Sequence, residues 1–415
     1  MYDYLALWDW VAFAVRWLHV ITAMAWIGAS FYFIALDLML KPAEDMPEGA
    51  YGEEWEVHGG GFYHTTKYLV APARMPEHLT WHKWQSYMTW LSGAVLLMIF
   101  YWVSGEIYLL DPNKAELALW QGIVISGGSL TIGWLIYDAA CKSKLSEHPT
   151  FLMLLLFAML VAMSWGYNQI FTGRAALLHL GAFTATIMTA NVFFQIMPNQ
   201  RIVVADLKAG RTPDAKYGKI AKVRSTHNNY LTLPVVFLML SNHYPLAFGT
   251  EYAWIIASLI FLTGVTIRHY FNTMHATGTG PHWTWAVTVI LMVIIAWLSV
   301  APMQFETSEE AETRALTPYE KSFADAEGFE EAYRVVLGNC SMCHAREPFY
   351  DDNMLWAPRG VHLETQADVA RQAKAIYLQA GLSHAMPPPN AVRTMTEENR
   401  RAIVAWYRDA TLGEK

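Results

Sequence analysis

The sequence predicts an all-α protein in which a polytopic membrane helix bundle is followed by a smaller helical domain. Hydrophobic residues make up 54% of the 415 residues and charged residues only 16%, which is too apolar for an ordinary soluble chain of this length. The apolar residues cluster in windows of about twenty, the length of a helix that crosses a bilayer. The C-terminal part instead has the periodicity of amphipathic helices.

Eight membrane spans are expected, arranged as two four-helix halves. The sixth window is the weakest because Pro234 and the polar segment 242–244 interrupt it, so seven spans is the alternative. The windows cover residues 10–38, 87–109, 117–139, 150–171, 175–197, 230–249, 252–269 and 283–302. An acidic linker, 304–317, separates the membrane domain, 1–303, from the C-terminal domain, 318–415.

Lysine and arginine residues predict the side of the membrane on which each loop lies, because cytoplasmic loops are enriched in them. The connection between the fifth and sixth spans contains seven, from Arg201 to Arg224. Both termini are therefore expected in the periplasm, with the chain as a multi-pass protein of the bacterial inner membrane. The first apolar stretch is too long for a cleaved signal peptide and lacks a basic start, so it is expected to be a true span.

Near the C-terminus, Cys340, Cys343 and His344 form a CxxCH sequence, which is the attachment motif of a c-type haem. The two thiols would bond to the haem vinyl groups, and the histidine would become the proximal iron ligand. The alternatives are a chance match or half of a zinc site, but Cys141 is the one other cysteine available to complete a zinc set. Bacterial haem c is attached in the periplasm, which agrees with the orientation predicted from the basic loops.

Met386 is the candidate for the second axial ligand of this iron. Three prolines follow it, at 387–389, and favour an extended loop over a helix. Amphipathic helices are expected around 327–337 and from the cap residue Thr396 through Trp406. This is the plan of a class I cytochrome c domain. Rival ligands are His384, Met354 and Met395.

The membrane domain contains a weak internal repeat. His19 opens the first span, and His179 opens the fifth span 160 positions later, each between leucine and an aliphatic residue. Two parallel halves are predicted, although membrane helices also resemble one another by composition alone. Both histidines are expected in the outer half of the bilayer, where each is a candidate iron ligand of a haem b. The alternative is a histidine that packs between helices and bonds to a backbone carbonyl.

Polar residues gather at the predicted cytoplasmic ends of the spans. Together they would suit a flat, nitrogen-rich, anionic molecule that enters from the cytoplasm. In the first loop, three glycines at 59–61 let backbone amides approach a ligand closely. The alternative is that such residues only anchor the helices at the bilayer interface. The group contains His64, His82, Thr226, His227, Asn228, Asn229, Arg268 and His269.

The chain resembles the bacterial membrane-bound urate hydroxylases of purine breakdown, of the type fused to a cytochrome c. The resemblance rests on the segment 17–28 (WLHVITAMAWIG), the loop 55–63 (WEVHGGGFY), the eight-span layout and the fused CxxCH. It covers essentially the full length, and the loop combined with CxxCH is its most specific part. The first span is also similar to that of bacterial membrane protoporphyrinogen oxidases, which bind haem, and this favours a ligand role for His19.

The resemblance implies oxidation of urate to 5-hydroxyisourate, with oxygen from water and electrons passing through haem c to a respiratory acceptor, a cytochrome or terminal oxidase. A base with a pKa near neutrality is needed, for which histidine is the natural residue. The candidate bases are His227, His269, His82 and His64. The candidate substrate-binding residues are Arg268, Thr226, Asn228 and Asn229, which would hold xanthine equally well.

Two other classes of protein are alternatives. A quinol-to-cytochrome subunit without its own small-molecule substrate would need stacked pairs of haem-binding histidines, and few deep histidines exist beyond His19 and His179. A transporter or sensor gives no reason for a covalent haem. The expected partners are urate, a respiratory electron acceptor and membrane lipid, with no nucleic acid.

Overall fold

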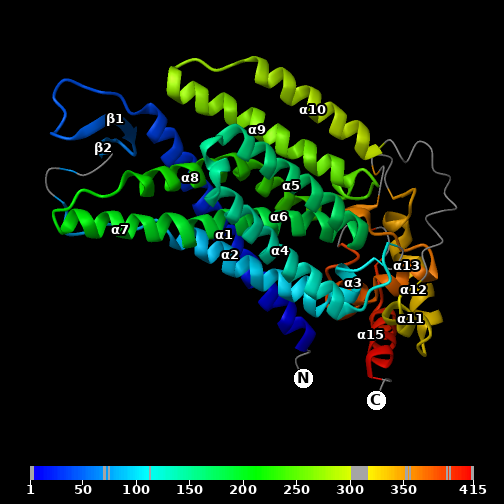
Figure 1. Ribbon diagram of the computed structural model, residues 1–415. Coiled ribbons are helices and arrows are strands. Elements are labelled where there is room, and N and C mark those ends of the chain that lie inside the picture. The colour runs from blue at the N-terminus through cyan, green and yellow to red at the C-terminus, as the bar shows by residue number, and fades with distance from the viewer. Residues whose placement is uncertain are drawn as a thin grey trace.

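The computed structural model describes residues 4–68, 72, 75–111, 114–300, 316–350, 354, 357–388, 391 and 394–412. Within them the chain is mostly helical, as predicted. Figure 1 shows a helix bundle with a β-hairpin and a helical arm at one end and a smaller C-terminal unit at the other. The predicted acidic linker lies almost entirely outside the described residues.

The helices of the bundle follow the predicted windows closely. Among the described residues, seven stretches are long and apolar enough to cross a membrane: α1, α2 with η1, α4, α5, α6 through α7, α9 and α10. The elements are α1 (Tyr4–Met39), α2 (Trp84–Leu97), the π-helical turn η1 (Met98–Val103), α3 (Gly105–Tyr108), α4 (Leu119–Lys142), η2 (Lys144–Glu147), α5 (Pro149–Ile170), α6 (Gly173–Ala190), the π-helical turn η3 (Asn191–Ile196), α7 (Met197–Lys208), α8 (Ala215–Leu240), η4 (Ser241–His243), η5 (Pro245–Ala247), α9 (Ala253–Thr277) and α10 (Trp283–Val300).

Helix α8 contains the sixth predicted span, and its bounds differ most from the prediction. It starts at Ala215 and ends at Leu240, where two short 3₁₀ turns take over. Its first half is polar, so α8 is not among the seven apolar helices, yet it packs inside the bundle against α6 and α9. Pro234 fits because Gly264 of α9 faces it: a side-chain carbon at Gly264 would lie 2.6 Å from Pro234 Cδ.

Residues 50–68 form a β-hairpin that the sequence analysis did not predict. Strands β1 (Ala50–His58) and β2 (Gly61–Tyr68) pair antiparallel, and Gly59 and Gly60 form the two-residue turn with φ of 59° and 81°. Positive φ at both central residues is what a type I′ turn requires, and glycine meets that need without strain. Two of the three glycines thus shape a turn at the tip of the hairpin.

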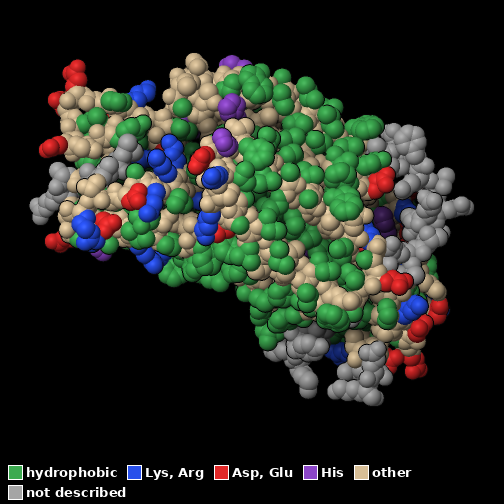
Figure 2. Space-filling view, viewed as in Figure 1, with side chains coloured by type: hydrophobic (Ala, Val, Ile, Leu, Met, Phe, Trp, Pro, Cys, Tyr) green, Lys and Arg blue, Asp and Glu red, His purple; other side chains and the backbone are tan. Residues whose placement is uncertain are grey.

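The surface divides along the bundle. On the face shown in Figure 2, hydrophobic side chains cover the middle of the bundle, as expected of helices that face lipid. Lysine and arginine gather at the end with the hairpin, and acidic residues gather over the C-terminal unit at the other end. The helical arm is formed by the end of α7, the connection 209–214 and the start of α8, and its exposed cations are Lys208, Arg211, Lys216, Lys219 and Lys222.

The C-terminal unit, residues 316–412, has its own hydrophobic core, which includes Phe323, Val336, Tyr377 and Trp406. Both predicted amphipathic helices are confirmed, as α12 and α15, and Thr396 Oγ1 accepts a hydrogen bond from Asn399 N at 3.2 Å. The elements are α11 (Pro318–Ala324), α12 (Phe329–His344), the 3₁₀ turn η8 (Pro358–Gly360), α13 (Gln366–Arg371), α14 (Ala373–Ile376), the π-helical turn η9 (Tyr377–Leu382) and α15 (Glu397–Leu412).

The C-terminal unit meets the bundle at a small cavity of about 160 Å³. Asp9 of α1 and Lys374 of α14 both line this cavity, along with Phe100 and Tyr108 of the bundle. Burial lowers the pKa of the Lys374 ammonium, and the nearby Asp9 carboxylate opposes that shift. The junction therefore places a lysine and an aspartate around one cavity at the end of the bundle opposite the basic arm.

Candidate functional site

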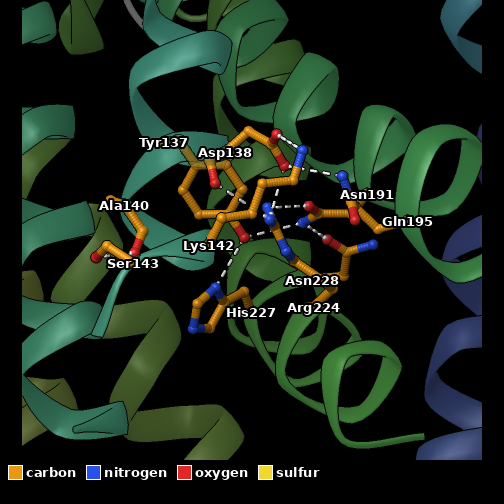
Figure 3. Close-up of polar contacts among 10 residues, drawn as sticks. All are labelled: Tyr137, Asp138, Ala140, Lys142, Ser143, Asn191, Gln195, Arg224, His227 and Asn228. Carbon is orange, nitrogen blue, oxygen red and sulfur yellow. Dashed lines mark hydrogen bonds and ion pairs between the residues drawn. The ribbon is translucent and has the colours of Figure 1, made fainter. Parts of the chain in front are cut away.

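A layer of polar side chains lies buried in the half of the bundle nearest the basic arm, where α4, η3 and α8 meet (Figure 3). Helix α8 packs against α6, η3 and α9, so residues on several of its faces are covered. His227, Asn228 and Asn229 are consecutive in α8, and all three are buried. Each must therefore find polar partners inside the protein.

An ion pair between α4 and α8 organises this layer. Arg224 is 1% exposed, and its Nη2 lies 2.6 Å from Asp138 Oδ1 while its Nη1 donates to Asn191 Oδ1 at 3.0 Å. Lys142 Nζ is 2.6 Å from Asp138 Oδ2, and Gln195 Nε2 donates to Asp138 Oδ1. The Asp138 carboxylate thus joins α4, α8 and η3.

We expect Asp138→Leu to lower the free energy of unfolding by about 3–5 kcal/mol, because Arg224 would lose its buried counter-ion. Arg224→Met should cost less, since Lys142 and Gln195 still contact Asp138. The double variant should regain much of the loss, because neither charge is then buried alone. Thermal or denaturant unfolding in detergent compares the three variants with the unchanged protein. An Asp138→Leu protein of unchanged stability would contradict this account.

Asn191 connects the ion pair to the rest of the layer. It is the first residue of the π-helical turn η3, and such turns widen a helix and often occur at functional sites. Its Nδ2 donates to Tyr137 Oη at 3.0 Å and to Asn228 Oδ1 at 2.9 Å. Asn228 Nδ2 in turn donates to the carbonyl of Met188. Asn228 is therefore fully engaged in holding helices together.

Tyr137 and His227 are the pair in this layer that is suited to acid–base chemistry. Tyr137 Oη lies 2.8 Å from His227 Nδ1, and the Cys141 thiol is also within hydrogen-bonding reach of Tyr137. The hydroxyl oxygen has two lone pairs, so it can accept from both Asn191 and a protonated Nδ1. In that tautomer His227 Nε2 keeps its lone pair, and it bonds to no described residue. The arrangement orients an imidazole that can take up a proton.

A second polar group lies on the α9 side of α8. Arg268 Nη2 donates to Asn272 Oδ1 at 3.1 Å and Asn272 Nδ2 donates to Asn229 Oδ1 at 2.9 Å. The guanidinium of Arg268 stacks over the ring of Phe31 of α1, 4.6 Å from its centre. Asn229 Nδ2 is buried and finds no partner among the described residues. A buried donor without an acceptor is what a ligand oxygen would satisfy.

The remaining predicted residues lie away from this layer, and each is exposed. His64 is on the hairpin, stacked on Trp55 at 4.2 Å and bonded to Glu53. His82 precedes α2, and its ring meets Phe33 edge-on. The list is completed by His269, whose ring lies near Trp283, and Thr226, which bonds back to the Lys222 carbonyl. Of the four predicted bases, the structure places His227 alone among buried polar partners.

His179, in α6, is fully buried with both ring nitrogens engaged. Nδ1 lies 2.8 Å from the Ala175 carbonyl and Nε2 lies 2.8 Å from Ser126 Oγ. Because Nδ1 must donate to the carbonyl, Nε2 accepts from Ser126 and is not free for iron. The rings of Tyr101 and Phe171 also pack against it. This geometry fits the helix-packing alternative rather than a haem b ligand.

His19, in α1, differs from His179 although the repeat relates them. Its Nδ1 lies 3.0 Å from the Thr89 carbonyl and 3.1 Å from Ser92 Oγ, both on α2. Its ring packs directly on Gly93, where a side-chain carbon would approach within 2.9 Å. No described residue bonds to its Nε2. Of the two histidines, His19 is therefore the one that keeps a nitrogen available for a ligand.

The CxxCH residues occupy the last turn of α12. Neither Cys340 nor Cys343 forms a disulfide, and burial raises the pKa of the Cys340 thiol to about 12. His344 Nδ1 lies 2.8 Å from the Val361 carbonyl, and the His344 carbonyl accepts from Leu363 N. A histidine that donates through Nδ1 to a carbonyl presents Nε2 to a metal, so this donor set fits a haem c.

The side chain of Met386 is 39% exposed, so it is not committed to the core. Its rivals fit the ligand role less well. Met395 is packed in the core of the C-terminal unit, and His384 lies exposed, 3.7 Å from Glu397. Met354 is half-buried. The geometry is compatible with Met386 as the second ligand of the predicted iron.

Sequence reasoning did not identify Tyr137, Asp138 or Asn191 as site residues, and it treated Arg224 only as a marker of the cytoplasmic side. One signal was present: Asp138 is the acidic residue within the third apolar window, 117–139. Ionised groups inside a membrane are rare unless they are paired or functional. Its partner, however, lies 86 positions away and follows only from packing.

Residues 5–299 match the model of a family described as urate oxidase N-terminal. The match covers the whole bundle, including His227, Arg268 and the hairpin, and it ends before the C-terminal unit begins. Comparisons of the chain with curated proteins and with solved structures found no match.

Proposed function

Because the chain belongs to the urate oxidase N-terminal family, we propose that it is a membrane-bound oxidoreductase that hydroxylates urate to 5-hydroxyisourate. The reaction adds one water to urate and releases two protons and two electrons. The observation that carries the proposal is the family match across the part of the chain that holds the buried Tyr137–His227 pair. The protein must therefore supply a base for the protons, an acceptor for the electrons and a binding site for the substrate.

His227 would act as the general base. Nδ1 bonded to Tyr137 leaves Nε2 to accept a proton from urate or from the attacking water, and burial in the bundle keeps competing solvent away. Asn191 and Arg224 fix the orientation of Tyr137 and so hold the imidazole in place. These residues would position and deprotonate the reactants without forming covalent bonds to them.

Asn229 and Arg268 would bind the substrate. Urate is planar and anionic near neutral pH, with carbonyl oxygens at its rim, and those oxygens need N–H donors. Asn229 Nδ2 is a buried donor without a partner, and Arg268 supplies a cation beside it. The Phe31 ring gives this group an aromatic neighbour. Asn228 is instead engaged with Asn191, and Thr226 is exposed, so neither is assigned a contact with the substrate.

Electrons would leave through the C-terminal unit, as a cytochrome c domain. A haem attached at Cys340 and Cys343 and ligated by His344 and Met386 would accept one electron at a time and deliver it to a respiratory cytochrome or terminal oxidase. In support, His344 Nδ1 is already oriented by the Val361 carbonyl. Should a second haem be present, His19 is favoured over His179 as its ligand, because its Nε2 has no described partner.

We further propose that the bundle spans the bacterial inner membrane eight times, with α8 as the sixth span. The basic arm would face the cytoplasm, and the C-terminal unit would lie in the periplasm. Support comes from the lysine and arginine residues that gather in Figure 2 at the end of the bundle opposite the C-terminal unit. The buried polar layer would then receive urate from the cytoplasm.

The test is anaerobic stopped-flow mixing of the oxidised, detergent-solubilised protein with urate, observed in the haem α-band. We expect the c-type band to be reduced promptly by urate and not by xanthine, and a b-type band would reveal a second haem. A protein with His269→Gln should behave like the unchanged protein, since this side chain is exposed. Reduction by a quinol but not by urate would overturn the proposal in favour of an electron-carrier subunit.

A further inference from the structure

Arg400 is a buried cation in the C-terminal unit. It lies in the first turn of α15, is 7% exposed, and forms no ion pair with a carboxylate in the part of the chain that the structure describes. A buried charge is retained only where other groups compensate for lost hydration. The contacts of Arg400 therefore indicate the role of this buried cation.

Those contacts converge on the loop that carries Met386. Arg400 Nη1 donates to the carbonyls of Ala380, Ser383 and Met386 at 2.5, 3.0 and 3.1 Å. Met386 N also donates to the Gln379 carbonyl at 2.9 Å. Both backbone polar groups of Met386 are thus held, although its side chain is not packed in the core.

Arg400 also lies near the haem attachment site. Helix α15 packs against α12, whose last turn carries Cys340, and the Arg400 charge interacts electrostatically with that thiol. Its Nε–H is buried and has no acceptor among the described residues. A carboxylate of a group bound at this place would satisfy both that donor and the positive charge.

We propose that Arg400 is a positioning residue for the haem c: it holds Met386 at the iron through the loop carbonyls and offers Nε–H to a haem propionate. This inference rests on the proposed function, because it requires that a haem is attached. Arginine is needed since its guanidinium presents donors in a fixed planar arrangement, which a lysine ammonium lacks. The adjacent Arg401 is exposed and serves as the matched control.

The test compares Arg400→Gln, Arg400→Lys, Arg401→Gln and Met386→Ala in the full-length protein. Covalently bound haem is quantified first, and then the near-infrared charge-transfer band of methionine–iron ligation and the midpoint potential are measured per attached haem. Both Arg400 variants should lose most of the band and have a lower potential, as Met386→Ala does, because methionine ligation raises haem potentials. Arg401→Gln should retain both.

Normalising to attached haem separates this role from a loss of folding. Arg400 variants that bind less haem but keep the band and potential of the unchanged protein per haem would overturn the inference and leave the proposed function intact. If the protein without substitutions carries no covalent haem, the proposed function itself is overturned.

Discussion

Replacement of His227 by glutamine should lower the rate of urate oxidation by about 10²–10⁴-fold, which is the usual contribution of a general base. Glutamine is of similar size and can still bond to Tyr137, so the buried layer should stay folded. It cannot accept a proton near neutral pH, and the slope at the acidic side of the pH–rate profile should therefore disappear. Steady-state rates with an artificial electron acceptor, measured across pH, give kcat and KM.

His269→Gln is the control for this experiment, because His269 lies exposed in α9 away from the buried layer. Its rate should stay within about two-fold of the unchanged protein. The rate of the Tyr137→Phe protein should lie between those of the His227→Gln and His269→Gln proteins. The substitution removes the hydrogen bond to His227 Nδ1 but leaves the imidazole. Normal turnover of the His227→Gln protein would show that another group accepts the proton.

Joint replacement of Cys340 and Cys343 by serine should remove covalent haem and reduce electron delivery from urate to background. The bundle should remain folded, because its hydrophobic core shares no residues with that of the C-terminal unit. Urate binding, measured by calorimetry, should therefore persist with little change in affinity. Haem staining of the denatured protein reports the covalent attachment.

Cys141→Ser is the matched control, since Cys141 lies in α4 beside Tyr137 and far along the chain from the CxxCH sequence. Its haem content should be unchanged. Continued delivery of electrons from urate to a respiratory acceptor by the double variant would mean that electrons leave the bundle by a route other than the C-terminal unit.

Several elements of the fold were predictable from local sequence. The apolar windows match α4, α5 and α10 within three residues, because a bilayer requires a minimum length of apolar helix. The β-hairpin was missed because its strands are mostly exposed or half-buried and most of their paired residues are polar or aromatic, so they carry little hydrophobic signal. The early start of α8 was missed because a charged segment extends the helix beyond its apolar part.

The candidate site was predictable only in part. His227, Asn229 and Arg268 were selected by residue type, and the structure buries all three, with Arg268 Nε donating to Asn229 Oδ1. His82 was selected on the same grounds but precedes its helix and is exposed, whereas α8 begins twelve residues before His227. Residue type does not reveal which side of a helix is covered by neighbouring helices, and so it does not reveal which residues are buried.

Hydropathy and the CxxCH spacing are properties of contiguous residues, so the linear chain alone specifies the long apolar helices, the helical C-terminal unit and the CxxCH sequence. The pairing of His227 with Tyr137 joins residues 90 positions apart, and that of Arg224 with Asp138 joins residues 86 apart. Such pairs depend on how α4, η3 and α8 pack, because burial forces each polar group to take whichever partner the neighbouring helix presents. Three-dimensional packing thus distinguishes His227, which is buried in the bundle, from the other three candidate bases, which are exposed.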